Sequence, residues 1–137
     1  MVDCLAAVLE RLIPSDEHGP GAREAQVLRY VERALEEHRS VYAEGLAELD
    51  GRARDEHGAP FAELAPAQQD ALLAALEAGG DSFFELVRLH AVQGMFGDPR
   101  HGGNAGFAGW DLLGFPGVKV IFTAVDQALD VDVERIR

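Results

Sequence analysis

The stretch GMFGDPRHGGNAGFAGWDLLGFPG, residues 94–117, interrupts a chain whose apolar residues elsewhere recur at helical spacing. It contains eight of the fifteen glycines and the single tryptophan of the 137-residue sequence. So much glycine disfavours a regular helix or strand, because glycine loses more conformational entropy on ordering than any other residue. A flexible linker, in turn, would not carry so much aromatic surface. The sequence therefore predicts a long ordered loop, roughly 96–117, rich in glycine and in the aromatic residues Phe96, Phe107, Trp110 and Phe115.

Before this loop, apolar residues recur every three or four positions, which is the pattern of helices with one buried face. The spacing predicts helices over residues 2–13, 21–38 and 40–55, and Pro14 ends the first of them. The one cysteine, Cys4, lies in the apolar stripe of the first helix and has no second cysteine to pair with. We expect it to be a buried structural thiol.

Two further helices are indicated by their end signals. One begins at Pro66, where a missing N–H costs nothing, and ends at the Gly79-Gly80 pair. The next begins at Ser82, which has Glu85 three residues later as in a capping box. After the loop, the apolar residues of 118–129 predict a sixth helix. The expected fold is all-α, a single helical domain of about six helices over residues 1–137.

The charge of the chain limits its partners. The formal net charge is −12 and the pI is about 4.7. Such a surface repels phosphate backbones and anionic lipid headgroups, so we expect no nucleic-acid partner. No segment approaches the ~20 apolar residues of a membrane span, so no direct membrane insertion is expected. The N-terminus lacks the basic residues of a signal peptide. This predicts a cytoplasmic chain as written, or an exported complex if the chain is a processed form or travels with a partner.

The glycine-rich loop has three chemical interpretations. For nucleotide binding, its glycines lack the spacing of the dinucleotide fingerprint, and no strand or P-loop lysine accompanies them. For a metal site, Asp98, His101 and Asp111 lie close in sequence, with His90 upstream, but no pair has a tight ligand spacing. For a catalytic dyad, His101 could act as a base oriented by a carboxylate, but no serine or cysteine nucleophile is near. The remaining interpretation is an ordered docking surface, because long ordered loops are usually functional.

Four blocks of the sequence resemble a known family. They are LIPSDEHGPGAREAQVLRYVERAL (12–35), FAELAPAQQDALLAALE (61–77), FFELVRLHAVQGMFGDPRHGGN (83–104) and GWDLLGFPG (109–117). In this order they look like the gluconate 2-dehydrogenase subunit 3 family, the small, gamma-type subunits of bacterial FAD-dependent sugar and sugar-acid dehydrogenases. The resemblance covers a core of about residues 5–117 and leaves 118–137 as a C-terminal extension.

The resemblance implies a non-catalytic accessory subunit. Its partner would be a large FAD-dependent subunit of the glucose-methanol-choline (GMC) type, which oxidises CH–OH groups of a sugar, polyol or gluconate and which the small subunit helps to fold or stabilise. FAD is then expected in the partner, and this chain holds no cofactor, metal or catalytic residue. A cytochrome c subunit is a further partner in many such complexes. The sequence departs from the family in lacking a twin-arginine signal and in having His101 where a tyrosine is expected.

The interface prediction falls on the loop, although each residue could instead only hold the loop against its own helices. Two rival functions stay open. One is a stand-alone small metal-binding protein or enzyme that uses His90, Asp98, His101 and Asp111, and the other is a transient cytoplasmic chaperone of the flavoprotein. The residues predicted to contact the partner are Phe96, Asp98, Arg100, His101, Asn104, Trp110 and Phe115.

Overall fold

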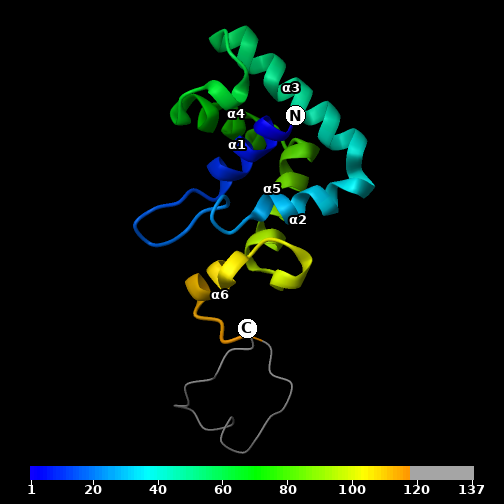
Figure 1. Ribbon diagram of the computed structural model, residues 1–137. Coiled ribbons are helices and arrows are strands. Elements are labelled where there is room, and N and C mark those ends of the chain that lie inside the picture. Colours follow the sequence, from blue (N-terminus) through cyan, green and yellow to red (C-terminus); the bar gives the residue numbers. More distant parts are fainter. Residues whose placement is uncertain (118–137) are drawn as a thin grey trace, which may run out of the picture.

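The computed structural model describes residues 1–117, and these form a single small all-helical domain (Figure 1). The all-α prediction is confirmed. Among the described residues the only extended pairing is an isolated bridge between Asp16 and Gly19. The sixth helix predicted at 118–129 lies outside the described residues. The helices are α1 Val2–Leu12, α2 Val27–Ala34, α3 Arg39–His57, α4 Pro66–Ala78, α5 Ser82–Phe96 and α6 Ala108–Leu113.

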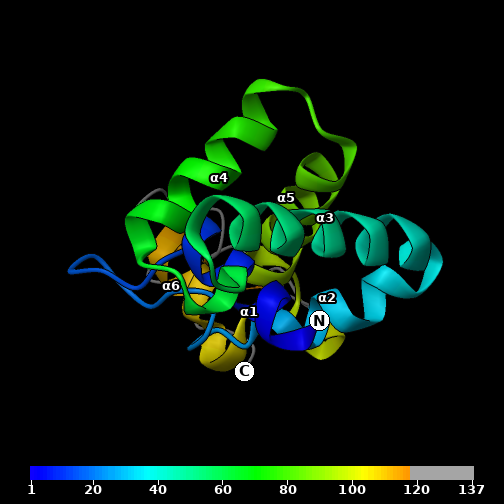
Figure 2. The ribbon, with the colours of Figure 1, turned by 90° about the horizontal axis from the view of Figure 1, so that it is seen from above.

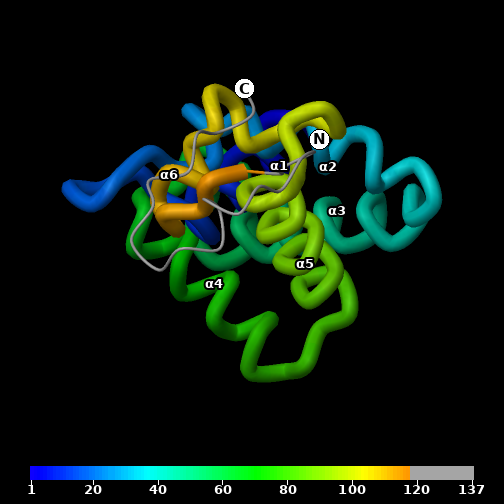
Figure 3. The backbone as a smooth tube through the Cα atoms, turned by 90° about the horizontal axis from the view of Figure 1, so that it is seen from below, coloured from blue at the N-terminus to red at the C-terminus, as the bar shows by residue number. Residues whose placement is uncertain are grey.

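The long helix α5 connects the two ends of the domain. It packs most extensively against α2 and also contacts α1, α3 and α4. Seen from above, α3 lies across α1 and α5 at one end of the molecule (Figure 2). Seen from below, the chain leaves α5 through a compact loop and enters α6, close to where the described chain ends (Figure 3). The loop and α6 therefore form the end of the domain opposite α3 (Figure 1).

The core lies where these helices meet around α1. Its largest fully buried side chains include Leu9, Tyr42, Leu49, Phe61 and Met95, one or more from each of α1, α3, α5 and the turn before α4. Burial of each such side chain contributes about 1.5–3 kcal/mol. The predicted burial of Cys4 is confirmed, since its side chain is within this core, and burial raises the pKa of its thiol to about 11.

The start of the second helix differs from the prediction. The sequence pattern placed it near residue 21, but α2 begins at Val27. Residues 21–26 instead form turns that are tied back to α1, because the N–H of Ala22 donates to the carbonyl of Ile13. Gln26 then adopts a left-handed conformation (φ 53°), which no helical residue can hold, and the helix starts after it.

The cap of α5 also differs from the predicted capping box. Asp81 is the N-cap residue, and its carboxylate accepts a hydrogen bond from the N–H of Phe84 at 2.9 Å. Ser82 is the first residue inside the helix rather than its cap. Aspartate and serine cap helices about equally well, so the sequence DS offers two adjacent start positions. The predicted Pro66 start of α4 is confirmed, since Pro66 is its first residue.

The crossing of α3 and α5 depends on a residue without a side chain. A Cβ atom at Gly45 would overlap the ring of Phe83, whereas a Cβ atom at Gly51 of the same helix would meet nothing within 4 Å. We predict that Gly45→Ala lowers the free energy of unfolding by about 1–3 kcal/mol through overpacking. Gly51→Ala, the matched control, should raise it by about 0.5–1 kcal/mol through helix propensity. Urea denaturation of both variants tests this, and an equal effect of the two would contradict it.

Candidate functional site

The loop after α5 is more regular than the sequence suggested. It contains two 3-10 turns, Pro99–His101 and Ala105–Phe107, and then the six-residue helix α6. The predicted long ordered loop over 96–117 thus contains a short helix, Ala108–Leu113, that the sequence analysis did not expect. Glycine spacing hid this helix, since α6 has Gly109 as its second residue and ends at Gly114 in the left-handed conformation.

Asn104 holds the loop together from its centre. Its side chain is 0% exposed, and its amide nitrogen donates to the carbonyl of Gly97 at 2.7 Å. Its amide oxygen accepts the N–H groups of Gly109 at 2.8 Å and Trp110 at 3.4 Å. One buried side chain therefore caps the first turn of α6 and satisfies the carbonyl that follows α5. Asn104 itself adopts φ 44°, a conformation that asparagine tolerates better than most residues.

Trp110 makes the second connection between α6 and α5. Its indole N–H donates to the carbonyl of Phe96 at 2.8 Å, and only 6% of the residue is exposed. Its ring packs against Phe107 at 5.4 Å and edge-to-face against Phe115 at 5.0 Å between centroids. Trp110 thus packs on two other aromatic residues of the loop at the end of α5.

Two glycines allow the backbone of the loop and α6 to approach the backbone of α5 closely. A Cβ atom at Gly103 would overlap the carbonyl of Gly94 in α5, and one at Gly109 would overlap the carbonyl of Met95. Gly103 also has φ 68°, which disfavours a larger residue. In addition, the N–H of Ala105 donates to the carbonyl of Ala25 at 3.0 Å, so the loop is attached to the segment before α2. These contacts fix the position of α6 relative to α5.

The charged residues of the loop lie at its surface. The Asp98 carboxylate accepts the backbone N–H of Arg100 at 3.0 Å and the Arg100 guanidinium at 2.7 Å. These hydrogen bonds hold the pKa of Asp98 below its usual value. The pair closes the first 3-10 turn, and the following His101 is exposed. The Asp98–Arg100 pair and His101 therefore lie at the edge of the loop surface, where they could contact a partner.

His90 lies away from this loop and is engaged elsewhere. Its Nδ1 and the hydroxyl of Tyr42 are hydrogen-bonded at 2.8 Å, and the two rings are stacked. The centroid of the His38 ring lies 5.6 Å from that of His90. Burial, and secondly the charge of His38, lower the pKa of His90. Within residues 1–117 no three His, Cys, Asp or Glu side chains are grouped to hold a metal ion. The geometry therefore offers no support for a site built from His90, Asp98, His101 and Asp111.

An exposed apolar surface crosses from α5 to α6. Leu89 is 52% exposed and Val92 48%, and helical spacing places both on the same face of α5 as Phe96. Past Phe96, Leu113 is 65% and Phe115 41% exposed. A shallow hollow of about 460 Å³ lies at this end, lined by Phe96, Trp110, Leu113, Gly114, Phe115 and Pro116. We call the set Leu89, Val92, Phe96, Leu113 and Phe115 the apolar ridge.

Sequence reasoning found only part of this ridge. It named Phe96 and Phe115 but missed Leu89, Val92 and Leu113. The signal was present, since α5 carries apolar residues on two sides: one face supplies Val87, Ala91 and Met95 to the core, and the other supplies the ridge. A helix that is apolar on two faces either is fully buried or presents one face to a partner.

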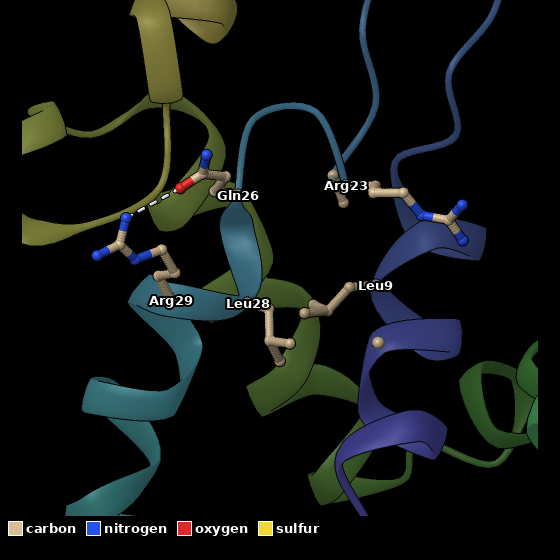
Figure 4. Close-up of a pocket in the computed structure, with 7 residues that line it drawn as sticks. Leu9, Arg23, Gln26, Leu28 and Arg29 are labelled. Atoms are coloured by element: carbon tan, nitrogen blue, oxygen red, sulfur yellow. Dashed lines mark hydrogen bonds between the residues drawn. The ribbon is translucent and has the colours of Figure 1, made fainter.

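A second cavity, of about 250 Å³, lies between α1 and α2. Figure 4 shows Leu9 and Leu28 inside it, while the guanidinium groups of Arg23 and Arg29 extend away on opposite sides. Gln26 accepts a hydrogen bond from Arg29 at 3.0 Å. Binding pockets for small molecules combine apolar walls with convergent polar groups, and here the polar groups diverge. The ridge is therefore the stronger candidate for function.

These features define a small helical protein that presents an exposed apolar surface at the end of the domain formed by α5 and α6. The chain belongs to the gluconate 2-dehydrogenase subunit 3 family, whose family model matches residues 2–117. The family name implies a subunit of a multi-subunit dehydrogenase complex. Searches of curated proteins and of solved structures found no match. No helix within residues 1–117 has the length and apolar character needed to cross a membrane.

We predict that Asn104→Ala detaches α6 from α5. Two buried N–H groups and the partly buried carbonyl of Gly97 lose their partner, which costs about 2–4 kcal/mol. Trp110 is the only tryptophan, so its fluorescence reports on the loop directly during urea denaturation. The exposed Arg100→Ala is the control and should change stability by less than about 0.5 kcal/mol. An Asn104→Ala protein with the same fluorescence transition as the parent chain would contradict this account.

The Tyr42–His90 pair predicts a pH dependence of stability. The pKa of His90 is lower in the folded chain than in the unfolded one, so the unfolded state binds the proton first. Stability from this group is complete above the unfolded pKa of about 6.5 and is lost as the pH falls through the lower folded pKa. The stability difference between the parent chain and His90→Gln should therefore shrink between pH 7.5 and 5. Urea titrations at several pH values measure this, and a constant difference would contradict it.

Proposed function

We propose that this chain is the non-catalytic small subunit of a dehydrogenase complex, and that its apolar ridge binds a large FAD-dependent subunit of the GMC type. The large subunit would carry FAD and oxidise the CH–OH group of a sugar, polyol or sugar acid. The small subunit would stabilise or help fold it. Family membership supports the subunit role, and the observation that carries the binding role is the ridge itself.

The ridge has the composition of an interface centre. Four of the seven large hydrophobic residues exposed in the described part of the chain belong to it: Leu89, Val92, Leu113 and Phe115. The core of an interface is more apolar than its rim, and the exposed charged residues Glu85 and Arg88 lie one helical turn before Leu89 and Val92, where a rim is expected. Since each side chain is roughly half exposed, covering it would contribute about 1 kcal/mol, before the costs of association. An exposed apolar surface lowers solubility, so its presence is better explained by binding than by solubility.

The loop residues have different roles in this proposal. Asn104 and Trp110 are buried within the chain, so they would act by holding α6 in place. Phe96 and Phe115 would contact the partner, while Asp98 and Arg100 lie where a polar rim is expected. Direct contact by His101, an additional cytochrome c subunit, and the cytoplasmic or exported location of the complex stay predictions.

The transient chaperone remains a variant of this proposal, because it would use the same surface on the same partner. It differs in one observable property: a chaperone leaves the mature complex, whereas a subunit stays. No observation in residues 1–117 favours the stand-alone metal-binding alternative.

The proposal is tested by affinity purification of the full chain from its native host, with the visible spectrum of the eluate. We expect a large flavoprotein in stoichiometric amount and the absorption bands of flavin. Leu113→Asp should weaken its retention about 30-fold or more, since a charge in an interface core costs about 2 kcal/mol or more. Ala74→Asp, on the exposed face of α4, is the matched control and should retain the flavoprotein.

Three outcomes separate the alternatives. A chain that elutes alone, from cells that contain the flavoprotein, would contradict the subunit role. Equal retention by Leu113→Asp and Ala74→Asp would place the interface elsewhere. A flavoprotein that is recovered during synthesis, but whose mature active form lacks this chain, would identify the chaperone.

A further inference from the structure

We propose that the interface of this subunit extends around α6, from the apolar ridge to a hairpin formed by residues 13–22, and that the same large flavin-dependent subunit covers both. The inference rests on the proposed function and adds a second half to the contact surface. The hairpin precedes α2 in the chain, so it belongs neither to the glycine-rich loop nor to the ridge.

The ridge alone is too small for a stable contact. Full burial of a Leu, Val or Phe side chain contributes about 1.5–3 kcal/mol at about 25 cal/mol per Å², which corresponds to about 60–120 Å². The five side chains of the ridge are at most about two-thirds exposed, so together they offer on the order of 300 Å². A stable interface buries about 800 Å² on each partner, more than half of it apolar. A partner held stably at the ridge must therefore contact apolar surface beyond it.

The exposed apolar surface continues across α6. Leu112 is 42% exposed and directly precedes Leu113 of the ridge. Consecutive residues of a helix point about 100° apart, so Leu112 presents its side chain on another side of α6. The two remaining large hydrophobic residues exposed in the described part of the chain, Met1 and Val2, begin α1 near α3, at the opposite end of the domain (Figure 1). Leu112 is therefore the apolar side chain through which the surface extends.

The hairpin lies directly beside Leu112. Gly19 is packed so closely that a Cβ atom there would overlap the Leu112 side chain. The hairpin and α6 lie on the same side of the domain when it is seen from below (Figure 3). A hollow of about 310 Å³ lies between the two elements, lined by His18, Pro20, Ala108, Asp111 and Leu112.

The hairpin is ordered by its own hydrogen bonds. The Asp16 carboxylate accepts the N–H groups of His18 at 2.8 Å and Gly19 at 3.2 Å. Asp16 and Gly19 also exchange two backbone hydrogen bonds, and the N–H of Ala22 closes the base by donating to the carbonyl of Ile13 at 2.8 Å. A preformed surface loses less conformational entropy when a partner binds. The exposed polar tip then lies where the rim of an interface is expected.

Alkylation of cysteine variants in the complex tests the inference. His18→Cys and Leu113→Cys place a thiol on the hairpin and on the ridge, while Glu44→Cys, exposed on α3, is the matched control. The parent chain is the blank, because its Cys4 is buried. In the complex with the flavoprotein, purified from the native host, we expect His18→Cys and Leu113→Cys to lose their fast alkylation and Glu44→Cys to keep it.

A substitution at Leu112 supplies an independent readout. Leu112→Asp should weaken retention of the flavoprotein about 10-fold or more, since it places a charge where the surface continues beyond the ridge. Ala74→Asp, on the exposed face of α4, should not weaken it. The fluorescence of Trp110 checks that α6 stays attached, and the alkylation result decides the question if Leu112→Asp does not fold.

The outcomes separate this inference from the proposed function. A complex that protects Leu113→Cys but not His18→Cys, or that forms equally with a folded Leu112→Asp chain, overturns the inference and leaves the proposed function intact. A chain that retains no flavoprotein contradicts the proposed function, and the inference with it. Alkylation of His18→Cys that is slow in the free chain and becomes faster on dilution would assign the hairpin to a second copy, which also overturns the inference.

Discussion

The hydrogen bonds of the buried Asn104 side chain hold together the end of the domain formed by the loop and α6. The side chain joins the carbonyl that follows α5 to the first N–H groups of α6, in a position that is 0% exposed. A helix of six residues has no stability of its own in water, so α6 exists because these groups and the Trp110 indole attach it to α5. The orientation of Leu113 and Phe115, and with it the continuity of the ridge, follows from one buried amide.

With α6 held in this position, some apolar residues of the loop pack inside it and others are exposed. Trp110 and Phe107 face the loop and hold it, whereas Leu113 and Phe115 are left at the surface. An asparagine at the centre suits this division, because its donor and acceptor are satisfied by backbone alone and place no charge beneath the ridge. The glycines at 103 and 109 then allow backbone contact with α5, so that α6 continues the outer face of α5 instead of standing apart from it.

Helices α1, α3, α4 and α5 were predictable because each has a periodic apolar stripe, and these stripes all lie in the core. The errors occur where local rules give two answers. Asp81 and Ser82 are equally good caps for α5, and only Asp81 takes that role. Residues 21–26 continue the apolar pattern of α2, but the hydrogen bond from the N–H of Ala22 to the carbonyl of Ile13 holds them in turns. The role of Asn104 could not be read from sequence, because it depends on carbonyl and N–H groups that only the folded loop brings together. The ridge was missed because periodicity reports that α5 has two apolar faces, but not which of them is covered.

An exposed ridge on a free subunit raises a conflict between solubility and binding. A permanently open apolar surface promotes association with other chains, while a permanently covered one cannot bind. In the proposed complex the partner removes this conflict by burying the ridge. Each roughly half-exposed side chain of the ridge would then contribute about 1 kcal/mol to binding, before the costs of association.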